Sequence, residues 1–127
     1  MLVIEAHDDV KAQTFYRPLG GGIEFGEKGA AAIIREIREE IAAEVVDIEY
    51  IGTLENIFTF NGDPRHEIIQ VYSGRFTDDA LYSTPSVPGV ESDGRAMRVI
   101  WKDVNTFSPR TPLYPDGLLE LLRARET

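Results

Sequence analysis

The segment from Gly21 to Ala43, with the sequence GGIEFGEKGAAAIIREIREEIAA, constrains the fold of this chain more than any other stretch. Apolar residues recur at helical spacing in its second half. At about 100° per residue they fall within a stripe roughly 100° wide, which predicts an amphipathic helix packed against a core. The residues of this stripe are Ala30, Ile33, Ile34, Ile37 and Ile41.

Three glutamates stand beside that stripe. Glu36, Glu39 and Glu40 are spaced i, i+3 and i+4, so the helix places their carboxylates side by side. Like charges in this arrangement repel one another and destabilise a helix. A divalent cation removes the repulsion, because hard ions such as Mg²⁺ take oxygen ligands. The spacing therefore predicts a metal site on the helix.

The first half of the segment is rich in glycine. Gly20, Gly21 and Gly22 permit a close approach of the backbone to a ligand. Gly26 and Gly29 flank Glu27 where the helix begins, and a helix N-terminus favours an anion, either a phosphate or the Glu27 carboxylate itself. Together, the loop and the carboxylates indicate metal-assisted chemistry on a phosphorylated compound.

The same segment resembles the Nudix box, G-x5-E-x7-R-E-U-x-E-E-x-G-U, in which U is a bulky apolar residue. Two positions depart from this pattern: Ala42 replaces the last glycine, and Ala43 is smaller than the usual U. The matching residues, all in register, are Gly21, Glu27, Arg35, Glu36, Ile37, Glu39 and Glu40.

The resemblance implies an α/β (α+β mixed) fold, a Nudix-like α/β/α sandwich with a mixed β-sheet between helices. Residues 1–127 would form one such domain, a size that suits a single core. The implied activity is that of a metal-dependent pyrophosphohydrolase, in which water attacks phosphorus in the diphosphate linkage of a nucleoside diphosphate derivative. The substrate would be a small-molecule nucleotide, and the cofactor Mg²⁺, with Mn²⁺ as a substitute.

By the same resemblance, Glu36, Glu39 and Glu40 supply catalytic and metal-ligand oxygens, and one of them acts as the base instead. The carbonyl of Gly21 is a further metal ligand. Glu27 and Arg35 form a salt bridge that orients the loop and the glutamates without binding the metal ion themselves.

Weaker candidates for substrate binding lie outside the box. Arg17, just before the glycine loop, is placed to reach a phosphate, and Glu91 lies where some family members place an additional glutamate. Phe58 and Tyr72, like Phe60 and Tyr82, offer faces on which a base or ribose can stack. For each aromatic residue the alternative is a place in the core, and for His66 it is a structural or surface role.

The composition of the whole chain restricts its partners. A net charge of −9 argues against nucleic acid and against anionic membranes, both of which need Lys and Arg. No apolar run is long enough for a transmembrane helix, and the N-terminus lacks the pattern of a signal peptide. The absence of cysteine excludes disulfides and thiolate ligands and fits a cytoplasmic protein.

The remaining elements follow from patterns of β-branched, aromatic and turn residues. In the family, a longer lead-in precedes the box, so an N-terminal strand is absent, is supplied by a partner chain in a homodimer, or is lost through a misplaced start. We predict strands at 2–6, 13–17, 44–60, 66–76 and 97–101, a hairpin turn at 61–64, a loop at 77–95 and a helix at 115–125.

Two further functions remain open. The departures at Ala42 and Ala43 leave room for a nucleotide-binding sensor that retains the box without turnover. Both residues stand where glycine would cap a helix, so we expect them to affect stability rather than chemistry. A Nudix-like RNA decapping enzyme is disfavoured, because the chain lacks a basic patch.

Overall fold

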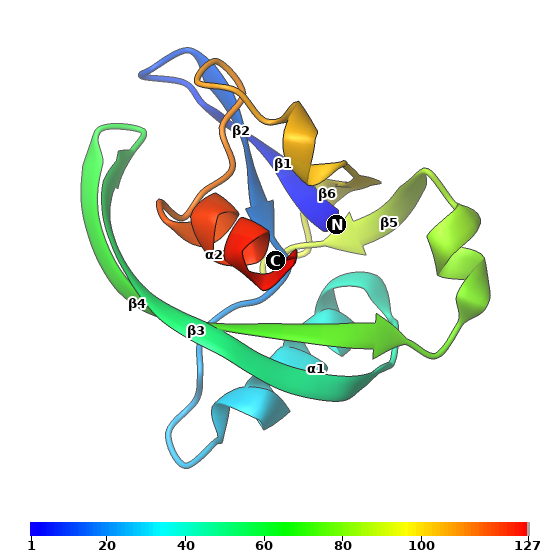
Figure 1. The fold of residues 1–127 in the computed structure, drawn as a ribbon. Coiled ribbons are helices and arrows are strands. Elements are labelled where there is room, and N and C mark those ends of the chain that lie inside the picture. Colours follow the sequence, from blue (N-terminus) through cyan, green and yellow to red (C-terminus); the bar gives the residue numbers. More distant parts are fainter. Residues whose placement is uncertain (127) are drawn as a thin grey trace.

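The computed structural model describes residues 1–126. Six strands and two α-helices are joined by loops that contain two short 3₁₀ helices (Figure 1). In chain order the elements are β1 (Leu2–Asp8), β2 (Gln13–Pro18), α1 (Gly29–Ile41), β3 (Val45–Phe60), β4 (Asp63–Phe76), a 3₁₀ helix (Asp79–Ser83), β5 (Ser86–Val90), β6 (Ala96–Trp101), a 3₁₀ helix (Val104–Thr106) and α2 (Leu118–Glu126).

A four-stranded sheet with the order β2-β1-β6-β5 separates the two helices. Side chains alternate along β1, and so it is buried on both faces. Leu2 and Ile4 join the core cluster that contains Ile37 of α1, whereas Val3 joins the cluster that contains Leu118 of α2. The expected α+β fold, with a sheet between helices, is confirmed.

The sheets differ from the single mixed sheet that was expected. β3 and β4 pair only with each other, as a separate hairpin, and all the strand ladders within residues 1–126 are antiparallel. β-bulges between Val46 and Glu49 and between Tyr50 and Gly52 interrupt the ladder of the hairpin. Because bulges increase the bend and twist of a strand, the hairpin curves away over α1 and α2 (Figure 1).

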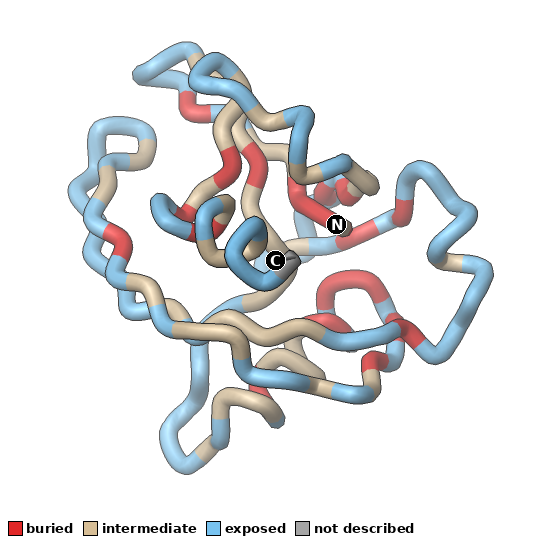
Figure 2. The backbone as a smooth tube through the Cα atoms, viewed as in Figure 1, coloured by how far each residue is buried: buried red, intermediate tan, exposed pale blue. Residues whose placement is uncertain are grey.

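The tip of the hairpin is a two-residue turn. Asn61 and Gly62 have φ values of 50° and 81°, as expected for the Asn-Gly pair of a type I′ turn. Asp63 and Pro64, which were assigned to the turn, instead begin β4. Figure 2 shows that most of the hairpin is exposed or half-buried, and that the buried residues are concentrated in β1, α1 and their neighbours.

The prediction of an uninterrupted loop at 77–95 is wrong. A 3₁₀ helix covers Asp79–Ser83, and Ser86–Val90 forms strand β5 against β6. Pro88 and Gly89 concealed this strand, since both residues usually interrupt sheets. The strand forms because β5 lies at the edge of the sheet, where proline is tolerated.

Helix α2 begins at Leu118, three residues later than predicted. Its residues Leu118, Leu119 and Leu122 belong to the apolar cluster that contains Val3 of β1. Gly52 of β3 lies directly beneath Leu121: a Cβ atom added at Gly52 would approach the Leu121 side chain to 3.1 Å. Within residues 1–126, neither helix has the length and apolar character needed to cross a bilayer.

One buried carboxylate ties the hairpin tip to the four-stranded sheet. Asp8, at the end of β1, is 2% exposed and accepts hydrogen bonds from the backbone N–H groups of Val10, Lys11 and Asn61 at 3.0, 3.0 and 3.2 Å. These bonds to an ionised acceptor lower the pKa of Asp8. The far end of the hairpin is therefore held in place by a side chain of β1.

We predict that Asp8→Ala lowers the melting temperature by several degrees, because three N–H groups lose a charged acceptor. Asp9→Ala is the matched control: its carboxylate is exposed, and its backbone N–H, which bonds Asn61 Oδ1, is retained. Thermal melts followed by circular dichroism compare the two. Equal melting temperatures would show that the tie is dispensable.

Helix α1 ends at Ala42, which has left-handed backbone angles (φ 55°, ψ 35°) and donates its N–H to the carbonyl oxygen of Arg38 at 3.0 Å. Alanine is strained in this region, whereas glycine is not. We predict that Ala42→Gly raises the free energy of unfolding by about 0.5–1 kcal/mol, the relief of strain being partly offset by the greater entropy of glycine in the unfolded chain. Urea unfolding measures this change. A loss of stability would contradict the left-handed assignment.

Candidate active site

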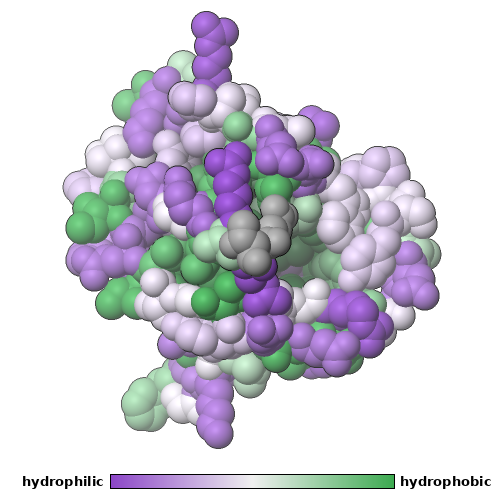
Figure 3. All heavy atoms as spheres, viewed as in Figure 1, coloured by the Kyte–Doolittle hydropathy of each residue, from purple (hydrophilic) through white to green (hydrophobic). Residues whose placement is uncertain are grey.

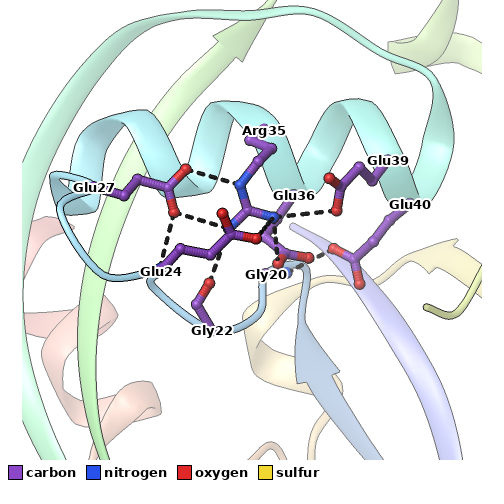
Figure 4. Close-up of polar contacts among 8 residues, drawn as sticks. All are labelled: Gly20, Gly22, Glu24, Glu27, Arg35, Glu36, Glu39 and Glu40. Carbon is purple, nitrogen blue, oxygen red and sulfur yellow. Dashed lines mark hydrogen bonds and ion pairs between the residues drawn. The ribbon is translucent and has the colours of Figure 1, made fainter.

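Arg35 is the centre of the polar contacts on α1 (Figure 4). Its Nε and Nη2 donate to the two carboxylate oxygens of Glu27, both at 2.8 Å, and Nη2 also donates to the carbonyl oxygen of Gly22 at 2.9 Å. The bidentate ion pair lowers the pKa of Glu27 to about 2. The expected salt bridge is therefore present, and it fixes the glycine loop to the second turn of the helix.

Glu27 does not cap the helix. Its Oε1 accepts the backbone N–H of Glu24 at 3.1 Å, and the N-cap residue Lys28 makes no capping hydrogen bond through its side chain. The carboxylate instead closes the loop on itself and holds Arg35. The Glu27 carboxylate is therefore not the anion at the helix N-terminus that the sequence suggested as one alternative.

Arg35 also lies between two of the three glutamates. Its Nη1 donates to Glu36 Oε1 at 3.0 Å and to Glu39 Oε2 at 3.1 Å. The Glu36 side chain is 17% exposed and that of Glu39 59% exposed. One guanidinium thus offsets the repulsion between neighbouring carboxylates that the sequence pattern implies.

Glu40 is the buried member of the cluster. It is 8% exposed, and its Oε1 accepts the backbone N–H of Gly20 at 2.8 Å. Burial raises the pKa of Glu40 to about 7, and the charges of Glu36 and Glu39 add to the effect, while the Gly20 N–H and Arg17 oppose it. The helix thus carries an acid that is only partly ionised at neutral pH.

These groups share a cavity of about 260 Å³. Gly21 lies against Glu36 there, because a Cβ atom added at Gly21 would stand 2.5 Å from the Glu36 carboxyl carbon. Only glycine permits this approach of the loop backbone to the carboxylate. The cavity is lined by Arg17, Gly20, Gly21, Gly22, Glu36, Glu39, Glu40, Val90, Glu91, Ser92 and Met97.

The donor set suits a hard divalent ion, because it consists of carboxylate oxygens beside a backbone-lined loop. Within residues 1–126, however, no three acidic or histidine side chains converge as a ready-made metal site. Glu36 and Glu39 are turned to Arg35, and Glu40 is turned to Gly20. A shared cation would therefore require Glu36 and Glu39 to exchange contacts with Arg35.

Arg17 and Glu91 meet at the edge of this cavity. Arg17, in β2, and Glu91, just after β5, approach to 3.8 Å, and Glu91 also pairs with Arg95 at 3.0 Å. Both Arg17 and Glu91 also line a second, larger cavity of about 1500 Å³. They therefore stand where the two cavities adjoin, with Gly20, Gly21 and Gly22.

Of the four aromatic candidates, Phe58, Phe60 and Tyr72 line the larger cavity and Tyr82 does not. Phe58 and Tyr72 both line the larger cavity, but the alternation along β4 places Tyr72 on the opposite face of the hairpin from Arg65, the partner of Phe58. The Tyr72 hydroxyl donates to Gln70 at 2.8 Å.

Phe60 lies on the same face of β3 as Phe58 and contacts Phe15, with ring centroids 5.9 Å apart. The two remaining candidates lie outside the larger cavity. Tyr82 is 48% exposed and packs on Trp101, with ring centroids 5.4 Å apart. His66 lies on the surface, 3.2 Å from Glu55.

Phe15, Asn56 and Tyr114 are among the residues lining the larger cavity that were not predicted from the sequence. Asn56 could have been found from the sequence, because side chains two residues apart along a strand share a face, and Asn56 lies between Leu54 and Phe58 in this alternation. Phe15 and Tyr114 could not have been found in this way. Their ring centroids lie 5.5 Å apart, but no local pattern predicts a contact between residues so distant in the chain.

An α+β domain in which an acidic helix faces an arginine-held glycine loop has the layout of an enzyme acting on phosphoric anhydrides. The NUDIX domain family matches residues 1–116, and the chain belongs to this family. The family assignment made from the Nudix box is thereby confirmed, and it places the chain among the Nudix hydrolases.

Two curated relatives are similar over a short stretch. Both are described as NAD-capped RNA hydrolase NudC, from Pseudomonas aeruginosa strains LESB58 and PAO1. Each is 45% identical over 38 residues, which is 30% of this chain and 14% of the relative's length. No solved structure matches this chain significantly.

The raised pKa of Glu40 predicts a pH-dependent stability. Between the ordinary value of 4.5 and about 7, the folded protein holds a proton that the unfolded chain has released. The contribution of Glu40 to the free energy of unfolding is therefore lost as pH rises through that window, by about 3 kcal/mol. Glu40→Gln keeps an acceptor for Gly20 N–H without the charge, so this variant should lack the decline.

The comparison is made by urea unfolding of both proteins at several pH values with a chelator present. The difference between them isolates Glu40 from all other titrating groups. Parallel stability curves would contradict the raised pKa.

Proposed function

We propose that this protein is an Mg²⁺-dependent pyrophosphohydrolase, in which water attacks phosphorus in the diphosphate linkage of a nucleoside diphosphate derivative. One observation carries the proposal: Glu36, Glu39, Glu40 and the glycine loop line one small cavity that adjoins a much larger one. A diphosphate fits the first and the remainder of the substrate fits the second. Membership of the Nudix family supports this class of reaction.

The residues of the chain then have distinct tasks. When bound, the divalent ion neutralises phosphate oxygens and makes a water molecule more acidic. Glu36, Glu39 and Glu40, with the Gly21 carbonyl, would hold the ion, and one of the glutamates would accept the proton of the attacking water. Arg17, at the junction of the cavities, would bind a phosphate, and its pairing with Glu91 keeps it in place.

Arg35 and Glu27 would hold the other residues of the site in place rather than contact the substrate. Their ion pair joins the loop to the helix, and so the ligand carbonyl of the loop and the glutamates of the helix keep one relative arrangement. Arg35 also places Glu36 and Glu39 through its own hydrogen bonds.

The substrates to be compared are nucleoside triphosphates, nucleotide sugars and molecules like ADP-ribose. The description of the two relatives adds NAD-capped RNA. The net charge of −9 argues against binding of an RNA chain. We therefore propose that the substrate is a small-molecule nucleotide and that the protein acts in the cytoplasm. Turnover of this panel with Mg²⁺, followed by phosphate release and product identification, separates the hydrolase from a nucleotide-binding sensor, which would bind and not turn over.

We predict that Glu39→Gln and Glu40→Gln each lower kcat by about 100-fold or more, the range expected for loss of a base or metal contact. KM should change less, because Arg17 and the glycine loop still bind the substrate. Titration with Mn²⁺ should show weakened binding in Glu40→Gln. Glu44→Gln is the control, since Glu44 is a nearby carboxylate that pairs with Arg38 and lines neither cavity.

Full turnover by both glutamine variants, with every substrate that the wild type accepts, would show that the cluster is not the catalytic centre. An equal loss in Glu44→Gln would show a general effect of charge rather than a site.

A further inference from the structure

The larger cavity has an aromatic wall. It lies between the β3–β4 hairpin and the four-stranded sheet, and Figure 3 shows hydrophobic side chains exposed between the hairpin and α2, within a largely hydrophilic rim. The ring of Phe15 packs on Phe60 at 5.9 Å and on Tyr114 at 5.5 Å, and Phe58 also lines the cavity. Aromatic faces of this kind bind the flat face of a nucleobase.

Asn56 is a buried polar residue in this cavity. It is 6% exposed, whereas Leu54, at the same parity in β3, joins the apolar cluster under α2. Its Oδ1 atom is inaccessible to solvent and has no hydrogen-bond partner within residues 1–126. Leaving a buried carbonyl oxygen unpaired is unfavourable, and such groups in native proteins are few. Asn56 therefore weakens the fold at a position where an apolar residue would strengthen it.

The groups around Asn56 indicate what it pairs with. Its unmet atom is an acceptor, and Glu67, directly opposite in the β3–β4 register, offers further acceptor oxygens on the same face. The Nε of the nearby Arg65 donates to Asp63 at 3.2 Å, and no donor within residues 1–126 bonds Asn56 Oδ1. An N–H group of a ligand would therefore satisfy this acceptor.

We propose that Asn56 determines specificity: its side-chain amide turns towards the cavity and accepts a hydrogen bond from an exocyclic amino group of the substrate's nucleobase, which lies against the aromatic wall. This inference rests on the proposed function. Adenine, cytosine and guanine carry such an amino group, and a planar amide can meet the edge of a base with one acceptor and one donor. Hypoxanthine and uracil present a carbonyl oxygen or a C–H at the same positions, and neither of these groups can donate a hydrogen bond to Asn56 Oδ1.

The junction of the two cavities supports one substrate bound across both. Arg17, Gly20, Gly21, Gly22 and Glu91 line the two together. A base at Asn56 therefore leaves the diphosphate directed towards the glutamates, with Arg17 between them.

Matched substrate pairs test the proposal. The pairs are guanosine against inosine, which differ only in the amino group, and adenosine against inosine and cytidine against uridine, in which a carbonyl oxygen replaces the amino group and the adjacent ring nitrogen carries a hydrogen. With identical diphosphate ends, the wild type should favour the amino member in kcat/KM by about 10-fold or more in at least one pair, as a good base contact provides. Asn56→Leu should reduce that ratio to near one. Glu55→Gln, on the exposed face of the same strand, should retain it.

The ratio is measured within one preparation, so a partly unfolded variant does not distort it, and Asn56→Ala serves if the leucine variant does not fold. An absence of preference in the wild type, or an unchanged ratio in the Asn56 variants, overturns the proposal.

A stability measurement distinguishes recognition from structure. Because Asn56→Leu removes an unpaired polar group, the variant without nucleotide should melt at or above the wild-type temperature. A clearly lower melting temperature in both Asn56→Leu and Asn56→Ala would show that the amide is bonded within the fold, and would overturn its assignment to a ligand.

Binding separates this proposal from the proposed function. Isothermal titration with ADP and IDP needs no turnover, so a preference for ADP that disappears in Asn56→Leu supports base recognition even if no substrate is hydrolysed. Conversely, turnover with equal binding of ADP and IDP by the wild type would leave the hydrolase intact and overturn the role of Asn56.

Discussion

The ion pair between Arg35 and Glu27 is the interaction on which the rest of the candidate site depends. The Arg35 guanidinium holds the loop by bonding both carboxylate oxygens of Glu27 and the carbonyl oxygen of Gly22. It also donates hydrogen bonds to Glu36 and Glu39. A lysine could carry the charge but not the planar fork that makes these contacts together. The fixed spacing of Glu27 and Arg35 in the Nudix box thus follows from the reach of a single side chain.

Several features of this region oppose folding. Glu40 is buried with its pKa raised, and Asn56 leaves an acceptor unpaired. The sheet supplies the compensation, since Val3, Ile4 and Val99 of its central strands are almost fully buried. Groups that are unfavourable in the folded protein and are held on a well-packed core are what a binding or catalytic site requires.

The sequence was most informative where one element decides the outcome by itself. Periodicity and the box residues placed α1 and gathered Glu36, Glu39 and Glu40 around one cavity, because helical spacing is local. The sequence was least informative where the structure of an element depends on the strand that it pairs with. Pro88 concealed β5, since an edge position cannot be read from local residues. No local pattern indicates that the hairpin pairs apart from the four-stranded sheet, or where its register shifts. For Asn56, the sequence indicated only that its side chain lies on the same face of β3 as those of Leu54 and Phe58.

The hairpin and the acidic helix are joined at Gly29, the first residue of α1. A Cβ atom there would overlap Gln70 and Tyr72 of β4, so glycine serves close packing at this position rather than an unusual backbone angle. The start of α1 is therefore seated directly on the hairpin, whose other end is tied to β1 through Asp8. With both contacts in place, the separation between the glutamates and Asn56 is set by the packed fold. A substrate bound across both cavities would accordingly be selected by the distance from its base to its diphosphate, as well as by the chemistry at either end.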